Sequence, residues 1–248
     1  MIVFLNLIFV LLLSSSTLLS TVSSFSNEVL TRNTNYLRRS TATTTTQLHV
    51  DFLKSLFSPP SSSSSSSTEV QNLKQELYTI CNNSYGKSTP QIQSQIQSLI
   101  TQLRQVNPTR NTAKSNLLQR EWIVLWTSEK EINWFIDNGI STCITQTLSG
   151  GTSLENWIPF TNGGGFGVVG TISVDDNDAV SSNSVEKGDN NIIRTQFKFN
   201  SAKLDLGKWG TYNFPPIGNG WFDTVYLDEE LRIDLNSRND ILICKSGM

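Results

Sequence analysis

Apolar residues recur at two different spacings along this chain, and the spacing changes near Leu117. Before that point, two segments show the spacing of amphipathic helices: Glu69 to Asn82, and a segment that begins at Thr89 and stops at Asn107-Pro108. Thr89 is a capping residue, and Pro90 suits the first turn of the second helix. We expect a helical hairpin that packs on the rest of the domain through one apolar face. The apolar positions are Val70, Leu73, Leu77 and Ile80, then Ile92, Ile96, Leu99, Ile100 and Leu103.

After Leu117 the apolar residues alternate with a period of two, which is typical of β-strands. Trp122 to Trp126 is large on both faces, as in a strand that is covered on both sides. Glu129 to Asn138 is a short exception with helical spacing. Seven or eight strands joined by Gly, Asn, Asp and Pro turns favour an antiparallel sandwich or barrel. The further strand candidates are Ser141 to Leu148, Asn156 to Phe160, Phe166 to Val174, Ile192 to Leu206, Thr224 to Leu227, Leu231 to Leu235 and Asp240 to Cys244.

The first 68 residues are unlike folded sequence. Ile2 to Leu13 is apolar and too short to span the roughly 30 Å core of a bilayer, so it indicates a signal peptide, with cleavage expected after Ser24. Residues 25–68 are rich in Ser and Thr and poor in acids, which is typical of a transit peptide. We therefore predict a signal peptide (1–24), a transit-like segment (25–68) and one domain (69–248), with helices within 69–107 and strands within 117–245. Ordinary secretion with a disordered linker is the alternative.

Two motifs suggest chemistry, but their context argues against it. Gly165 to Gly170 has the glycine spacing of dinucleotide-binding turns, yet Thr171 to Val174 continues as a strand where a helix is required. We interpret these glycines as positions where a barrel strand bends or approaches a ligand. Asp175 to Asn191 is polar and acidic without the spacing of a calcium loop, and we expect a long exposed loop there.

Composition excludes several classes of function. The first 68 residues carry a net charge of +2 and the remainder −4, with Lys and Arg scattered singly, so we expect no nucleic-acid partner. The single histidine, His49, lies in the segment that we expect to be removed. Histidine-based catalytic and metal sites are therefore not available to the mature chain, and we predict neither a metal nor a cofactor. Cys81, Cys143 and Cys244 are widely separated, which suits unpaired small hydrophobes.

Large aromatic residues are the most distinctive feature of the predicted strands and strand ends. In a sandwich they would simply fill the core. In a barrel of about eight strands the interior can instead hold one elongated apolar ligand. Phe222 belongs to this aromatic group, next to Trp221. The candidate ligand-binding residues are Trp122, Trp126, Phe166, Phe197, Phe199, Trp221 and Tyr226.

The segment Gly220 to Ile233, with the sequence GWFDTVYLDEELRI, closely resembles the C-terminal signature of the plastid lipid-associated proteins, or fibrillins. Asn107-Pro108-Thr109 followed by Leu118 to Ser128 resembles the opening of that family's domain, and Gln196 to Phe199 precedes the signature as expected. The resemblance covers Glu69 to Cys244. It implies a mainly β, antiparallel, lipocalin-like barrel behind the helical pair. It also implies motif positions with a structural role, namely Asp223, Leu227, Asp228, Leu231 and Arg232.

Three positions in this signature and in the turn after it carry expectations of their own. Because burying a lone charge costs several kcal/mol, we expect Asp228 and Arg232 to form an ion pair with each other or to cap backbone groups near the mouth of the barrel. Asn239 stands in the turn that follows, where the family has glycine. We expect it to adopt the left-handed conformation that closes that hairpin.

The resemblance implies a non-enzymatic protein that binds or coats apolar isoprenoid lipids, of the carotenoid or quinone type, at plastoglobules or thylakoids. A signal peptide followed by a Phe-led transit peptide is similar to the two-part presequence of algae with complex plastids. We expect an apolar lipid ligand and a peripheral contact with a lipid-particle or thylakoid surface. Two other hypotheses stay open: a structural adaptor with a filled barrel that docks on lipid particles or on a lipid-biosynthetic enzyme, and a cofactor-free lipid isomerase or cyclase that uses Tyr226 or a carboxylate.

Overall fold

The structure, a computed structural model, describes residues 65–84, 87–179, 193–215 and 218–247. Glu69–Met248 forms one unit. The signal peptide expected in 1–24 and nearly all of the transit-like segment expected in 25–68 lie outside the described residues. Over the described ranges, the structure contains no helix with the length and apolar character needed to cross a membrane.

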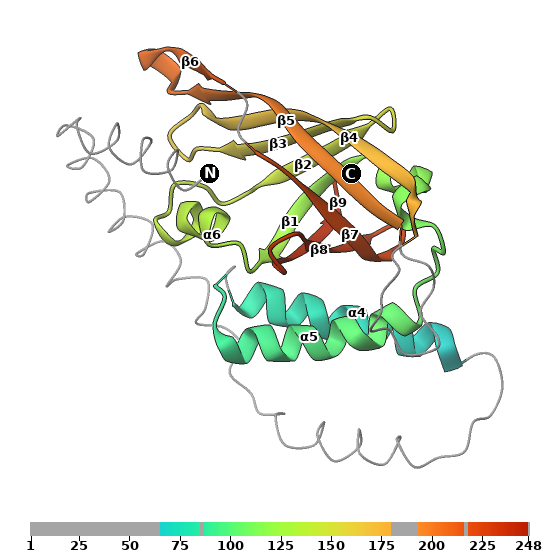
Figure 1. The fold of residues 1–248 in the computed structure, drawn as a ribbon. Helices are drawn as coiled ribbons and strands as arrows, with labels where there is room; N and C mark the ends of the chain where they lie inside the picture. The colour runs from blue at the N-terminus through green and yellow to red at the C-terminus, as the bar shows by residue number, and fades with distance from the viewer. Residues whose placement is uncertain (1–64, 85–86, 180–192, 216–217, 248) are drawn as a thin grey trace, which may run out of the picture. The chain divides into compact units, whose positions relative to one another are not determined.

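Two helices precede the strands, as the spacing of apolar residues predicts (Figure 1). Helix α4 covers Ser65–Asn83 and helix α5 covers Pro90–Gln105. Thr89 caps α5, because its side chain accepts a hydrogen bond from the backbone N–H of Ile92, and Pro90 takes the first helical position. The buried residues of the two helices are Leu73, Lys74, Leu77, Cys81, Ile96, Leu99, Ile100 and Leu103.

Nine strands follow, with one short helix between the first two, and most match the predicted ranges. The predictions missed β6 and began β7 too late. Strand β4 runs on to Ala179, so the loop predicted from Asp175 is wrong over its first five residues; residues 180–192 lie outside the described part. The elements are β1 (Glu121–Thr127), α6 (Lys130–Asp137), β2 (Thr145–Ser149), β3 (Ser153–Pro159), β4 (Gly165–Ala179), β5 (Ile193–Asp205), β6 (Thr211–Phe214), β7 (Asn219–Leu227), β8 (Leu231–Asn236) and β9 (Ile241–Ser246), with single 3-10 turns at Thr112–Lys114, Asn116–Leu118 and Gly207–Trp209.

Eight of these strands close into an antiparallel barrel, which confirms the predicted fold class (Figure 1). The strand order is β4-β3-β2-β1-β9-β8-β7-β5, and pairing between β4 and β5 completes the ring. Strand β6 pairs with the end of β5, over Ala202 to Asp205, so it extends the sheet beside the ring. Asn239 has a φ of 61°, which confirms the left-handed conformation expected for the turn between β8 and β9.

Two β-bulges decide which side chains face the interior of the barrel. In β1 the register shifts between Val124 and Trp126, and in β7 it shifts between Thr224 and Tyr226. Simple alternation would place Trp126 on the same face as Trp122, but the extra residue of the bulge turns Trp126 outward. The bulge in β7 does the same to Tyr226.

Helices α4 and α5 cover the outer face that the bulges create. Trp126 and Tyr226 belong to one buried cluster with Leu77, Ile100 and other residues of the two helices. The Nε1 atom of Trp126 donates a hydrogen bond to the carbonyl of Lys87, 3.1 Å away in the connection between the helices. Strand β1 is therefore covered on both sides, as its sequence predicts.

The segment after α5 supplies hydrogen-bond partners to backbone groups of β7 beyond Phe222, where the pairing of β7 with β5 ends. The Asn107 side chain accepts a hydrogen bond from the N–H of Leu227 at 3.1 Å, and the Thr109 hydroxyl donates to the carbonyl of Leu227 at 2.7 Å. The Thr112 hydroxyl donates to the carbonyl of Thr224 at 2.8 Å. Buried backbone groups that lack partners are costly, so this segment stabilises the bulged strand.

If the helical pair is part of the folded core, Leu77→Ala should lower the free energy of unfolding by about 3 kcal/mol, because it leaves a cavity between α4 and the barrel. Chemical denaturation followed by circular dichroism measures this change. The exposed neighbour provides the control: Glu76→Ala should change stability by less than about 0.5 kcal/mol. Equal stability of the two variants would show that the helices contribute nothing to the fold.

Candidate functional site

The interior of the barrel is lined mainly by apolar side chains from seven strands. Cys244 in β9 is among them, and burial raises the pKa of its thiol to about 12, so it behaves as a neutral hydrophobe. The centre of the Phe197 ring lies 5.1 Å from that of Phe199 and 6.4 Å from that of Phe222. The inner cluster comprises Leu118, Trp122, Leu148, Leu154, Ile172, Phe222, Leu227 and Cys244, with Leu117, Val124, Phe197, Phe199 and Leu242 packed against it.

A third apolar cluster surrounds helix α6. Phe135 of this helix is buried with Ile144 and Ile158, and Phe166 packs against the group. Val124 contacts both this cluster and the inner cluster, so the two are continuous.

The structure divides the seven aromatic residues predicted to bind ligand between the two faces of the sheet. Trp122, Phe197 and Phe199 belong to the inner cluster, and Phe166 lies in the cluster around α6. Trp126 and Tyr226 lie on the outer face under the helices. Trp221 is also outside that inner cluster, since its register partner Gln196 is exposed.

Trp221 has a local partner instead of a place in the interior. The guanidinium of Arg194 lies 3.4 Å from the centre of its ring and also binds Asp223 at 3.0 and 3.1 Å. Its neighbour Phe222, which was left out of the predicted ligand set, is the residue of this pair that faces inward. Both residues are large aromatics, so residue type alone does not show which of them faces inward. The pairing register of β7 decides it.

A buried ion pair lies among the inward-facing side chains. Arg232 is 0% exposed and Asp234, two residues further along β8, is 2% exposed. The Arg232 Nε atom donates to Asp234 at 3.1 Å, Nη2 donates to the second carboxylate oxygen, and the Thr224 hydroxyl donates to Asp234 at 2.7 Å. The predicted ion pair between Asp228 and Arg232 is therefore wrong: Arg232 lies deep in the barrel and takes its partner from its own strand.

Asp228 instead joins the turn between β7 and β8 to helix α4. One carboxylate oxygen accepts hydrogen bonds from the N–H groups of Glu230 and Leu231 at 2.8 and 2.7 Å, which confirms the predicted backbone cap. The other accepts from the Nζ of Lys74 at 2.8 Å and from the Tyr226 hydroxyl at 2.9 Å. Burial alone would raise the pKa of the Asp228 carboxyl, but these hydrogen bonds together hold it below its ordinary value.

Lys74 and Tyr226 complete this network on the outer face. The Nζ of Lys74 also lies 2.6 Å from Glu230, and although burial opposes its charge, the two carboxylates raise its pKa. Burial and the neighbouring Asp228 raise the pKa of the Tyr226 hydroxyl. The charged motif positions thus anchor a helix to the barrel.

The glycines of β4 make close contacts with neighbouring strands. A Cβ atom on Gly165 or Gly167 would lie 2.5 or 2.8 Å from the ring of Trp157, and one on Gly170 would lie 2.5 Å from the carbonyl of Lys198. The chain continues as a strand through Ala179. Because no helix follows these glycines, they do not form a dinucleotide-binding turn.

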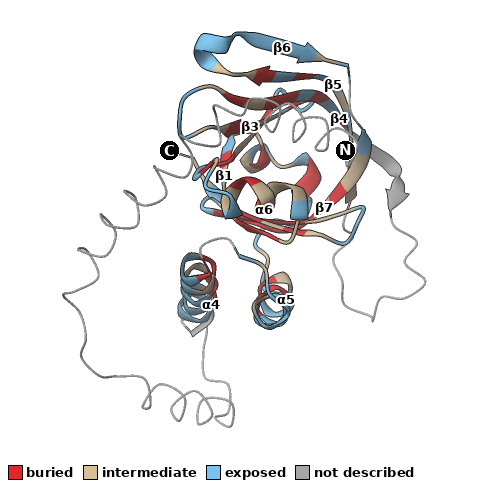
Figure 2. Cartoon of the chain, turned by 90° about the vertical axis from the view of Figure 1, so that its left-hand side faces the viewer, coloured by how far each residue is buried: buried red, intermediate tan, exposed pale blue. Residues whose placement is uncertain are grey.

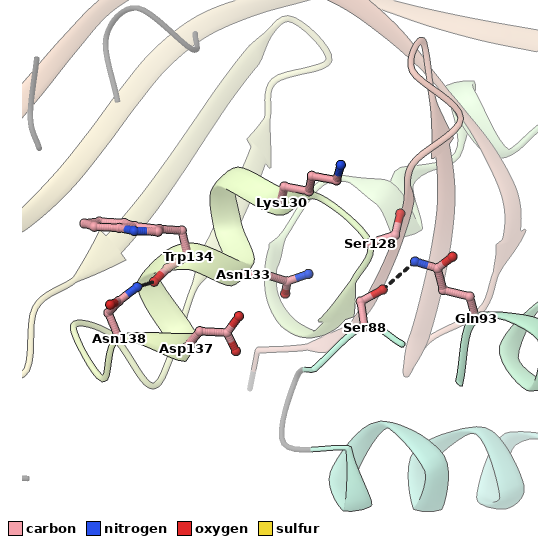
Figure 3. A pocket seen from close by; sticks show the side chains of 8 residues that line it. All are labelled: Ser88, Gln93, Ser128, Lys130, Asn133, Trp134, Asp137 and Asn138. Carbon is pink, nitrogen blue, oxygen red and sulfur yellow. Dashed lines mark hydrogen bonds between the residues drawn. The ribbon is translucent and has the colours of Figure 1, made fainter. Parts of the chain in front are cut away.

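A groove of about 300 Å³ lies outside the barrel, between α6 and the start of α5 (Figure 3). Asn133 points into it from α6, and Ser88 and Gln93 face each other across a 2.7 Å hydrogen bond on the opposite side. The lining combines amide, hydroxyl and charged groups with the side chain of Trp134. The lining residues are Ser88, Gln93, Ser128, Lys130, Asn133, Trp134, Asp137 and Asn138.

The network around Asp228 predicts a pH-dependent effect of Lys74→Met. At pH 7 the free energy of unfolding of the variant should be about 2 kcal/mol lower than that of the unaltered protein, because Asp228 loses its buried cation. The contribution of Asp228 is complete above its unfolded pKa of about 3.9 and disappears as the pH falls through its lower folded value. The difference between the two proteins should therefore shrink below about pH 4. Chemical denaturation of both proteins across this pH range measures the difference. A difference that stays constant down to low pH would contradict the role of Asp228 as the partner of Lys74.

Comparisons with known proteins agree with the resemblance described above. The model of the PAP_fibrillin family matches residues 71–209, which includes the helices and the strands from β1 to β5. Probable plastid-lipid-associated protein 11, chloroplastic, from Arabidopsis thaliana is 32% identical over 132 residues, which is 51% of this chain. The match spans about half of that relative, 55% of its length, and no solved structure matches. Since the family match covers more than half of the chain, the protein belongs to the PAP_fibrillin family.

Proposed function

We propose that this protein is a non-enzymatic binder of apolar isoprenoid lipids, of the carotenoid or quinone type, in a plastid. The observation that carries the proposal is the closed ring of strands whose inner face is aromatic and aliphatic. Transfer of apolar area from water gives about 25 cal/mol per Å², so an elongated hydrocarbon gains affinity from such a lining without a metal or cofactor. The name of the chloroplastic relative supports both the plastid and the lipid.

The arrangement of the interior supports some candidate ligand residues more than others. Trp122, Phe197 and Phe199 are inward-facing and are proposed to contact the lipid, together with Phe222. Phe166 is proposed to contact the end of the lipid that lies near α6. Trp126, Trp221 and Tyr226 are proposed instead to hold the outer surface of the barrel.

Tyr226 is the residue on which the hypothesis of a lipid isomerase or cyclase depends. Its hydroxyl donates to Asp228 beneath α4, on the face of the sheet that points away from the interior. A general acid or base must reach the bound substrate, so Tyr226 does not suit that role. The proposal therefore excludes catalysis through this residue.

A projecting hairpin supports a peripheral contact with a lipid surface at a plastoglobule or thylakoid. Trp209 and Tyr212, between β5 and the end of β6, are 73% and 51% exposed, and Lys203 and Lys208 are exposed beside them. Figure 2 shows β6 as an exposed edge of the sheet. Tryptophan and tyrosine favour the boundary between headgroups and acyl chains, and lysines attract anionic headgroups.

The adaptor hypothesis remains as the second candidate, supported by the groove between α6 and the start of α5 and by the exposed glutamines of α5. A filled barrel would take up no lipid. If the protein binds lipid as proposed, the delipidated protein should take up β-carotene or decylubiquinone at one molecule per chain. Absorbance after gel filtration measures this uptake. Failure of both lipids to bind would favour the adaptor.

Two adjacent residues of β4 test whether the lipid lies inside. Ile172 is buried in the inner cluster, whereas Thr171 is exposed on the opposite face. Ile172→Trp should lower the affinity for the lipid by at least about tenfold because it occupies interior volume, and Thr171→Trp should leave it unchanged. Equal affinities of the two variants, with melting temperatures showing that both are folded, would place the lipid elsewhere.

The hairpin predicts how the protein meets a membrane. The double change Trp209→Ser and Tyr212→Ser should weaken flotation with vesicles of phosphatidylcholine and phosphatidylglycerol by about tenfold, and added salt should weaken the unaltered protein too. Val106→Ser, at an exposed apolar residue elsewhere, is the matched control. Vesicle binding that survives the double change would show that another surface makes the contact.

A further inference from the structure

Three polar atoms inside the barrel lack hydrogen-bond partners among the described residues. They are the Nη1 atom of Arg232, the hydroxyl of Thr195 and the Oε1 atom of Gln146. Arg232 is 0% and Thr195 1% exposed, so protein surrounds both. A buried polar group without a partner costs about 1–3 kcal/mol, and three in one interior point to something that satisfies them.

The three atoms come from different strands, and each belongs to a side chain that neighbours the ring of Trp122, the ring of Phe222 or both. Gln146 of β2 is the register partner of Trp122, and Thr195 of β5 is the register partner of Phe222. The guanidinium of Arg232 lies 5.8 Å from the ring of Trp122 and 5.2 Å from that of Phe222. Both polar side chains therefore flank rings that the arginine also contacts.

The charges of this polar group indicate what it can hold. Asp234 already compensates the charge of Arg232, so an anion would bring an unbalanced negative charge into an apolar interior. A cation would lie close to the guanidinium. A neutral oxygen suits the site, because Nη1 donates, Oε1 accepts and the Thr195 hydroxyl does either.

We propose that the barrel binds an apolar molecule that carries a neutral hydroxyl or carbonyl oxygen, and that this oxygen lies among Arg232, Thr195 and Gln146. The inference rests on the proposed function and refines it, because it separates oxygenated lipids from pure hydrocarbons. The aromatic and aliphatic lining binds the chain of the lipid, and the polar group fixes which end enters.

Thr195→Val is the most direct test, since valine has nearly the same shape and the hydroxyl has no partner among the described residues. Removing an unsatisfied buried hydroxyl should raise the melting temperature of the lipid-free protein by about 3 °C. The same change should weaken binding of an oxygenated ligand by about fivefold. A purely structural hydroxyl would not move stability and affinity in opposite directions.

The ligands are a matched pair that share one branched chain: phytol, with a hydroxyl, and phytane, without it. Each is transferred from phosphatidylcholine vesicles to the full chain, and the bound fraction is measured by native mass spectrometry. For each ligand, the affinity of the variant is divided by that of the unaltered protein. The solubility of the ligand affects both affinities equally and therefore cancels. Phytol affinity should fall about fivefold in Thr195→Val and phytane affinity should not change. Thr171→Val, at an exposed position, should affect neither.

The outcomes separate the inference from the proposed function. If phytol and phytane both bind but Thr195→Val changes neither affinity, the polar site is wrong and the lipid-binding function stands. If neither ligand binds the unaltered protein, the proposed function fails as well. Phytanic acid tests the charge argument: its affinity should rise as the pH falls and its carboxylate becomes neutral, and ionised acid that binds as tightly as phytol would overturn the requirement for a neutral oxygen.

Discussion

The closure of the sheet between β4 and β5 is the constraint on which the rest of this structure depends. Pairing along these two strands converts a row of neighbours into a ring and gives the sheet an inside. Every second side chain along each strand is then removed from water together, which is favourable only if those side chains are apolar or paired. The cluster around Trp122 meets that requirement because its side chains are apolar, and Arg232 and Asp234 meet it because they pair with each other.

The bulges and the helical pair are a second consequence of closure. One part of the outer surface is apolar, and the bulges add Trp126 and Tyr226 to it. Helices α4 and α5 bury this surface, and the bonds from Lys74 to Asp228 and from Asn107 and Thr109 to Leu227 hold them in register. The most charged part of the C-terminal signature therefore serves assembly, while its aromatic part contributes Phe222 to the interior.

Much of the fold was predictable because its signals are local. The helices, the cap at Thr89, the left-handed Asn239 and the strands follow from spacing and residue type. The faces of individual aromatics were not predictable, since a bulge adds a residue without changing the apolar pattern, and Trp221 and Phe222 differ only by register. The partner of Arg232 was missed for a related reason: the depth of a charge along a strand depends on closure, whereas the prediction placed it near a strand end. Strand β6 alternates polar and aromatic residues, but it has only four residues, Thr211–Phe214, which are too few to separate a strand from the glycine- and proline-rich sequence around it.

The central claim is that the interior of the barrel holds a neutral apolar lipid. The most direct measurement is to purify the processed protein from its native organelle without detergent, extract it, and identify and count the lipids by mass spectrometry. The account predicts about one isoprenoid molecule per chain, bearing a hydroxyl or carbonyl oxygen and enriched over the surrounding membrane. A protein that emerges free of lipid, or with membrane lipids in their bulk proportions, would contradict it.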